Sequence, residues 1–385
     1  MSGRLLRLVC TAAVAAGIVL APVPAAAEPA PGTADDRTVA GLLTDLQRLY
    51  REAERATETY NGTEERLKEQ RAEVRRLDAE LARARTSLHD SRGAAGRLAR
   101  QQYQSSSNLS PYLRLLLARD PQHAIDQGHV IGRLARERVD TVGRLTGDEK
   151  KAQELSRRSR EALARQAALA ERQEEERDGV RERLRAVEEL LASLTPEQLA
   201  ALAELENSGI AEEQERFLAS GALGDDAKPS AGGESAVRFA VEQLGKPYEW
   251  GAEGPASYDC SGLTSVAWER AGTPIPRTSQ EQWARLDHVP LDELRPGDLV
   301  VYFPEATHVA MYLGDGMVVQ APRPGADVKV SPIAANPVLG AVRPDPDGEP
   351  VRRYTPPRLP AGATDGSDQG YAASYAPAAP ETSAR

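Results

Sequence analysis

Residues 248–271 read YEWGAEGPASYDCSGLTSVAWERA and contain Cys260 at their centre. A loop rich in glycine and aromatic residues leads into this cysteine, and the apolar residues after it, among them Leu263 and Ala267, recur with a helical period. Gly272 follows them and is a typical helix end. The pattern therefore predicts Cys260 in the first turn of a short buried helix, where backbone N–H groups and the helix dipole favour a thiolate. A nucleophilic cysteine is expected in such a position.

Residues 1–27 have the pattern of a secretory signal peptide. Arg4 and Arg7 give a basic start, residues 8–20 an apolar middle, and residues 25–27 a run of small residues suited to cleavage. The alternative is a membrane anchor, although the apolar run is shorter than the roughly 20 residues that a span needs. We expect a cleaved signal, a secreted or cell-wall protein, and a flexible lead-in that continues to residue 37.

Cleavage would remove Cys10, the other cysteine of the chain, and leave Cys260 alone. A lone thiol on an exported protein has no internal disulfide partner, so it indicates a reactive cysteine. The alternative is a buried, inert cysteine, which is common in proteins generally. The flanking Asp259, Ser261 and Gly262 favour the reactive thiol.

Residues 38–219 are dense in Arg, Glu, Leu and Ala, and their apolar positions follow a heptad repeat. A second apolar run covers residues 163–194, and two prolines interrupt the stretch between the two runs. We therefore expect a coiled-coil hairpin whose tip carries a short apolar helical element at 113–117. This element either docks a partner or packs on its own hairpin. The heptad seam consists of Leu67, Val74, Leu81 and Leu88, with Leu77 and Ala84 between them.

A polar, Gly-rich linker over 220–233 separates this half from a compact domain at 234–344, and a tail at 345–385 is expected to be disordered. The domain is predicted to be α+β, with helices packed on an antiparallel sheet. Its expected elements are a helix at 235–244, the Cys260 helix, a third helix in the polar stretch that residues 276–279 open, a strand at 299–303, and a hairpin of strands 309–313 and 317–320 around Gly314-Asp315-Gly316.

A cysteine nucleophile needs a base, and the domain contains two histidines. His288 lies in a polar loop, whereas His308 opens an apolar strand, which makes His308 the better base. With a three-residue hairpin loop, Gln320 lies diagonally across from His308 on the same face, whereas a two-residue loop would place it on the opposite face. We expect the side-chain oxygen of Gln320 to accept the proton on His308 Nδ1. The alternative for Gln320 is an ordinary polar strand end.

Several ordered motifs resemble the NlpC/p60 cysteine peptidases of bacterial cell walls. The resemblance covers residues 234–344 and implies a papain-like α+β domain that cleaves peptidoglycan stem peptides, usually between the D-glutamate side-chain carboxyl and a diamino acid. The motifs are Pro247-Tyr248-Glu249-Trp250-Gly251, Asp259-Cys260-Ser261-Gly262-Leu263, Pro276-Arg277-Thr278-Ser279 with Gln282, Pro296-Gly297-Asp298-Leu299-Val300, His308-Val309-Ala310-Met311-Tyr312-Leu313-Gly314 and Gln320-Ala321-Pro322.

By position, the resemblance implies that Cys260 is the nucleophile, His308 the base and Gln320 the third polar residue. Many members of the family have histidine where this chain has Gln320, and a neutral amide stabilises imidazolium less, so we expect modest activity. No metal or other cofactor is expected, since the domain has no H-E-x-x-H pair. The resemblance also implies a substrate cleft lined by Tyr248, near the thiol, and by Asp259, Ser261, Arg277 and Ser279.

The N-terminal half resembles the coiled-coil regions of exported, division-associated wall hydrolases. This resemblance implies that the coiled coil docks on a membrane-embedded division complex and restrains the peptidase until signalled. Two alternatives stay open: an amidase on the same fold that cuts between muramic acid and L-alanine, and a non-catalytic coiled-coil scaffold. Nucleic acid is not an expected partner, because the net charge is -10 and no basic patch with interleaved aromatics is present.

Overall fold

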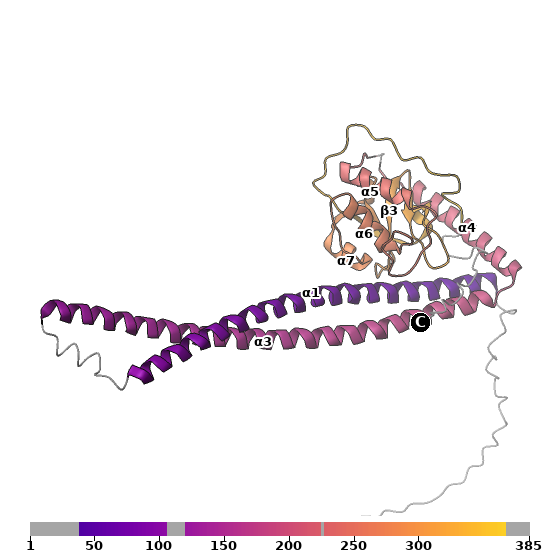
Figure 1. Ribbon diagram of the computed structural model, residues 1–385. Helices are drawn as coiled ribbons and strands as arrows, with labels where there is room; N and C mark the ends of the chain where they lie inside the picture. Colours follow the sequence, from indigo (N-terminus) through magenta and orange to yellow (C-terminus); the bar gives the residue numbers. More distant parts are fainter. Residues whose placement is uncertain (1–37, 106–119, 225–226, 367–385) are drawn as a thin grey trace, which may run out of the picture. The chain divides into compact units, whose positions relative to one another are not determined.

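The computed structural model describes residues 38–105, 120–224 and 227–366, so the signal segment and the apolar element at 113–117 lie outside the described residues. Two long helices, α1 (Val39–Ser105) and α3 (Pro121–Ala192), run side by side in antiparallel directions (Figure 1). No helix in the described ranges is long and apolar enough to cross a membrane.

The heptad positions of α1 are buried against α3. They are apolar and spaced so that one stripe of the helix faces its partner, which removes the stripe from water. Hydroxyl–carboxylate pairs such as Ser159 Oγ to Asp78 Oδ1, at 2.8 Å, flank this stripe. The buried cluster consists of Val74, Leu77, Leu81, Ala84 and Leu88 of α1 with Ala152, Leu155 and Ala162 of α3.

Helix α4 (Pro196–Ala219) follows α3 and begins at a capping box. The Thr195 side chain accepts a hydrogen bond from the Gln198 backbone N–H, and the Gln198 side chain accepts one from the Thr195 N–H. Pro196 occupies the first helical position, where its fixed φ suits the helix and its missing N–H leaves no hydrogen bond unmade. Two backbone donors at the helix start are thereby satisfied, which fixes where α4 leaves the hairpin.

Helix α5 (Ala231–Glu242) begins earlier than the sequence predicts, inside the stretch interpreted as a linker. Ser230 caps it by accepting a hydrogen bond from the Gly233 backbone N–H at 2.8 Å. Gly233 packs so closely that a Cβ there would lie 2.7 Å from the Pro296 carbonyl oxygen. The glycines therefore allow a close approach of helix and loop, and only part of 220–233 is a connection.

The compact domain is α+β, as predicted, with α5, α6 (Cys260–Arg270) and α7 (Ser279–Arg285) beside a six-stranded antiparallel sheet. The strand order is β1-β6-β2-β3-β4-β5. Two 3₁₀ turns, Leu291–Glu293 and Ile333–Ala335, connect parts of the sheet. The strands are β1 (Asp287–Val289), β2 (Leu299–Tyr302), β3 (His308–Gly314), β4 (Met317–Gln320), β5 (Lys329–Pro332) and β6 (Val338–Arg343).

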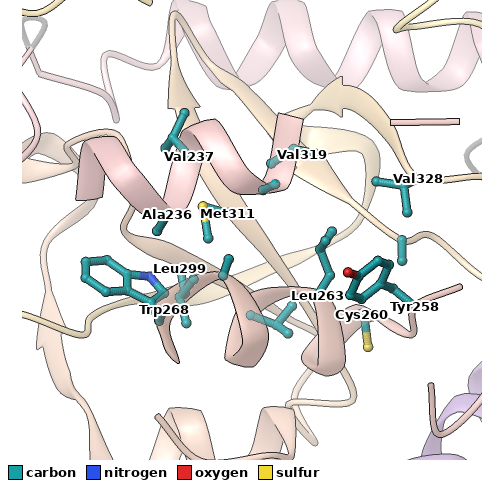
Figure 2. Packing of buried hydrophobic residues seen from close by; sticks show 14 of the residues in the cluster. Ala236, Val237, Tyr258, Cys260, Leu263, Trp268, Leu299, Met311, Val319 and Val328 are labelled. Atoms are coloured by element: carbon teal, nitrogen blue, oxygen red, sulfur yellow. The ribbon is translucent and has the colours of Figure 1, made fainter. Parts of the chain in front are cut away.

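Alternate residues of the central strands are buried on opposite faces of the sheet, as the period of two requires. One face, with Leu299 and Met311, packs on α5 and α6. Figure 2 shows this cluster, with Trp268 and Cys260 at opposite sides of the packed residues. The other face, with Val300 and Tyr312, packs partly against α4 and the loop that follows it. Both faces are covered, so the sheet is a rigid support for β3.

Residues 345–366 lie against the domain, although the sequence predicts a disordered tail from 345 onward. Arg295 donates to the Asp345 carboxylate at 2.9 Å, and Ser230 also contacts this carboxylate. Further along, the Val330 N–H donates to the Ala363 carbonyl at 2.8 Å. Beyond Asp345, the tail is held through backbone carbonyl groups, such as those of Gly348, Arg352 and Gly366, which composition does not indicate.

Candidate active site

Cys260 is the first residue of α6, the position expected from the sequence. The helix is capped by Asp259, whose Oδ1 accepts the Gly262 N–H at 2.6 Å. The backbone N–H of Val309, on strand β3, lies close enough to the Cys260 sulfur to lower the pKa of the thiol against the larger effect of burial. Helix and strand therefore hold the thiol directly beside the start of β3. The cysteine itself is only 3% exposed.

The thiol is not poised as a thiolate in this arrangement, in contrast to the expectation from the helix dipole alone. Burial raises the pKa of Cys260 well above its ordinary value, and the carboxylates of Glu58, Asp259 and Glu54 raise it further. Two of these carboxylates belong to α1. The partial charge at a helix start stabilises an anion only modestly, so burial and three nearby carboxylates outweigh it.

His308 and Gln320 are in direct contact, with 2.6 Å between His308 Nε2 and Gln320 Oε1. The prediction that Gln320 faces Nδ1 is therefore wrong, and it is Nε2 that meets the amide. Gln320 Nε2 in turn donates to Ser331 Oγ at 2.7 Å, which directs the amide oxygen toward the imidazole. Ser331 was not identified from the sequence, since a lone serine on a strand carries no distinguishing pattern.

The strand register explains why Gln320 reaches the histidine. Met311 pairs with Val319 and Tyr312 with Val318, which is the register expected for a three-residue loop. The pairing shifts by one residue at Gly314, whose φ of 112° is favourable only for glycine. The bulge therefore preserves the same-face relation between His308 and Gln320.

His308 is held in its neutral form. Burial lowers its pKa to about 4, the nearby Arg323 lowers it as well, and the hydrogen bond with Gln320 acts in the opposite direction. Its Nδ1 is buried without a hydrogen-bond partner among the described residues. A neutral imidazole with one nitrogen held by an amide and the other available can accept a proton from a thiol.

Replacing Gln320 by alanine is expected to lower kcat about 10-fold, because the imidazolium formed in catalysis loses its acceptor, a hydrogen bond of about 1.4 kcal/mol. Gln320 acts through His308, so the pH profile of kcat should also shift toward a lower pKa. Steady-state rates from pH 5 to 9 check both. Gln320→His should retain most of the activity, and an unchanged Gln320→Ala enzyme would contradict the positioning role.

The expected cleft residues gather around Asp259. Arg277 holds its carboxylate with two hydrogen bonds, Nη1 to Oδ1 at 3.0 Å and Nη2 to Oδ2 at 2.7 Å, and donates to Ser261 Oγ at 2.9 Å. Ser279 Oγ donates to the Ala306 carbonyl at 2.7 Å. The donors and acceptors converge on one side of the α6 start, and such a bidentate pair fixes their geometry.

Tyr248 is buried next to this group. Burial raises the pKa of Tyr248 well above the ordinary value, and the charge of an ionised Cys260 would raise it further. The phenol therefore lies within electrostatic reach of the thiol. His288, in contrast, stacks on Trp283 and contacts its carbonyl oxygen at 2.8 Å. The described part of the chain contains no group of three or more His, Cys, Asp and Glu side chains that could hold a metal ion.

Three polar residues of α1 also belong to the site, and sequence reasoning missed them. Glu58 Oε1 accepts from Ser261 Oγ at 2.8 Å, and Asn61 Nδ2 donates to Asp259 Oδ2 at 3.0 Å. Glu54 Oε1 lies 3.8 Å from His308 Nδ1. Charged residues on a heptad-rich helix are typical of a solvated face, so no local signal distinguished them.

Comparison with known proteins places this site in a family context. Residues 245–340 match the NlpC/P60 family. A probable endopeptidase of Corynebacterium glutamicum is 47% identical over 96 residues, which are 25% of this chain and 46% of that protein. A probable endopeptidase of Mycobacterium tuberculosis is 37% identical over 116 residues, 29% of this chain and 30% of that protein. The chain thus spans less than half the length of these relatives.

Among solved structures, the NlpC/p60 domain of the peptidoglycan hydrolase SagA is 31% identical. The match covers 29% of this chain and 97% of the SagA domain, with a TM-score of 0.28. These similarities concern the compact domain.

Proposed function

Since the chain belongs to the NlpC/P60 family through residues 245–340, we propose that it is a cysteine endopeptidase that cleaves peptidoglycan stem peptides between the D-glutamate side-chain carboxyl and the diamino acid. One observation carries the assignment of the catalytic set. The strand that supplies His308, hydrogen-bonded to Gln320, packs against α6, so that its next backbone N–H, that of Val309, lies near the sulfur of Cys260.

In the proposed mechanism, His308 takes the thiol proton and the Cys260 sulfur attacks the carbonyl carbon of the scissile amide. Backbone N–H groups at the start of α6, including that of Cys260, stabilise the oxyanion. The tetrahedral intermediate collapses to a thioester as His308 protonates the leaving amine. A water molecule, deprotonated by His308, then hydrolyses the thioester and restores the thiol.

The helical hairpin is proposed to restrain this activity. Cys260 and His308 are 3% and 1% exposed, and Glu54, Glu58 and Asn61 of α1 contact the residues around them. A stem peptide must displace α1 from this surface before its amide reaches the sulfur. Export to the cell wall, and docking of the hairpin on a membrane-embedded division complex that moves α1, complete the proposal.

Digestion of purified peptidoglycan fragments by the full chain, read by mass spectrometry, tests the bond. The matched control is Cys260→Ala. A second variant, Gly62→Trp, is designed to displace α1, so that cleavage can be detected even if the hairpin fully blocks the site in the parent protein. Loss of the D-glutamyl–diamino acid bond only with intact Cys260 is the expected result. Release of whole stem peptides would establish the amidase instead. No cleavage by the folded Gly62→Trp protein would overturn the enzyme and favour the scaffold.

A further inference from the structure

One face of α1 lies in the active site rather than in water. Tyr50, Glu54, Glu58 and Asn61 are spaced by three or four residues, so they share one side of the helix. All four are buried, which is unusual for glutamate and asparagine on a long charged helix. We call these four residues the acidic face of α1.

Glu58 is the best-anchored member of the acidic face. Its Oε1 accepts from Ser261 Oγ at 2.8 Å, and its Oε2 lies 2.6 Å from the Ser279 backbone N and 2.8 Å from Ser279 Oγ. Arg277 donates to Ser261 Oγ, so the Ser261 hydroxyl hydrogen points toward Glu58. The carboxyl group therefore closes a hydrogen-bond network that joins α1 to the start of both α6 and α7.

Glu54 is buried equally deeply but has no such anchors. Both of its carboxyl oxygens, and the Nδ1 atom of His308, are buried without a hydrogen-bond partner among the described residues. The two side chains face each other, with 3.8 Å between Glu54 Oε1 and His308 Nδ1. A buried carboxylate without hydrogen bonds is unfavourable, whereas a carboxylic acid is neutral and has a proton to offer the imidazole.

The charges around Glu54 do not fully offset the cost of burying its ionised carboxylate. Arg323 and Arg51 favour its ionised form, while Glu58 opposes it. Burial is the largest effect and raises the pKa of Glu54 from 4.5 to about 7.

Opposing effects also act on the pKa of Glu58. Burial again contributes most, followed by the carboxylate of Asp259, and together they raise the pKa of Glu58 from 4.5 to about 7 although Arg277 and the two serine hydroxyls act in the opposite direction. Other titratable groups that border the acidic face are Glu64 and Glu253, which both lie near Arg277, and Tyr248 and Cys260.

We propose that the acidic face is a proton-dependent latch, which holds the active site shut while Glu54 and Glu58 carry protons and releases it when both ionise. This latch rests on the proposed function, because it specifies how α1 restrains the same catalytic site. A protonated pair is neutral and fits the buried surface. An ionised pair places two further negative charges beside Asp259 in a buried site, and the charges are better solvated once α1 has moved away.

The sign of the pH effect follows from where protons are bound. In the open state both glutamates are in water and titrate near 4.5, so between pH 4.5 and about 7 the closed state holds two protons that the open state lacks. His308 acts in the opposite direction, since its pKa is about 4 when closed and returns toward 6.5 on opening. Opening therefore releases one proton in total between pH 4.5 and 6.5, and two protons between pH 6.5 and about 7. Rising pH therefore opens the latch.

Hydrogen exchange at the Ser279 amide tests the latch directly, because that N–H is held by Glu58. The protein is the full chain with Cys260→Ala, which removes both hydrolysis and the titration of the thiol. After correction for the intrinsic exchange rate, the opening constant should rise on the order of tenfold per pH unit between pH 5 and 6.5 and level off above about 7.5.

The double variant Glu54→Gln, Glu58→Gln keeps one accepting oxygen in each side chain and removes both titratable carboxyl groups. His308 then has the largest remaining shift, so the opening constant of the double variant should fall as pH rises, which reverses the sign of the pH dependence. Glu69→Gln, at an exposed position of α1, is the matched control and should retain the normal profile. A flat profile in the parent protein, or a rise that survives in the double variant, would overturn the latch. Neither outcome depends on which bond the enzyme cleaves, which the peptidoglycan digest decides.

Discussion

Replacing Cys260 by alanine is expected to lower the rate of stem-peptide hydrolysis by about 10³-fold or more, because no covalent intermediate can then form. The rest of the site remains in place, since Asp259 still caps α6 and His308 still contacts Gln320. The measurement is the initial rate on a purified peptidoglycan fragment, followed by mass spectrometry. Thermal unfolding should show that the variant is folded.

Cys260→Ser sharpens this prediction. A serine hydroxyl is far less acidic than a thiol, and the partner of His308 is the neutral amide of Gln320, which stabilises the imidazolium less than a carboxylate would. We therefore expect the serine variant to be nearly as inactive as the alanine variant, although its hydroxyl occupies the same position. More than about a tenth of the parent rate in the alanine variant would place the nucleophile elsewhere.

The sequence predicted those parts of the site that local chemistry determines. Asp259 is a helix-capping residue, the residues after Cys260 have a helical period, and Gly314-Asp315-Gly316 specifies a hairpin. These short-range signals were enough to place Cys260 at a helix start and to bring Gln320 to the same face as His308. The wrong nitrogen of His308 was predicted because ring orientation depends on packing around Tyr302 and β4, which no pattern encodes.

The contribution of α1 was beyond such reasoning. Glu58 and Ser261 are 203 residues apart, and Asn61 and Asp259 are 198 apart. A glutamate on a helix rich in Arg and Glu has the same local environment whether it faces water or a catalytic site. The thiolate expected at Cys260 is not favoured because burial raises the pKa of the thiol, and because Glu58 and Glu54 of the distant α1 add to this effect together with the adjacent Asp259.

The substitution Gly62→Trp is expected to raise the hydrolysis rate of the full chain about 5- to 150-fold, which corresponds to the 1–3 kcal/mol that overpacking typically costs. Gly62 lies on α1 beside the acidic face, and a Cβ built there would already contact Thr278 Cγ2 at 3.9 Å. An indole extends well beyond Cβ and competes for the space of the buried Thr278. If closure limits activity, destabilising the closed state by this energy raises the open fraction by the same factor.

The matched control for Gly62→Trp is Gly96→Trp on the same helix, where nothing lies within 4 Å of an added Cβ. Both substitutions replace a helical glycine, which by itself favours the helix slightly, so hairpin stability should change alike in the two variants. Only the tryptophan side chain at position 62 would contact the compact domain. Equal rates for the two variants would show that α1 does not limit access to Cys260, while leaving the cysteine chemistry intact. A faster Gly62→Trp enzyme whose activity is still lost with Cys260→Ala would tie the hairpin to that same thiol.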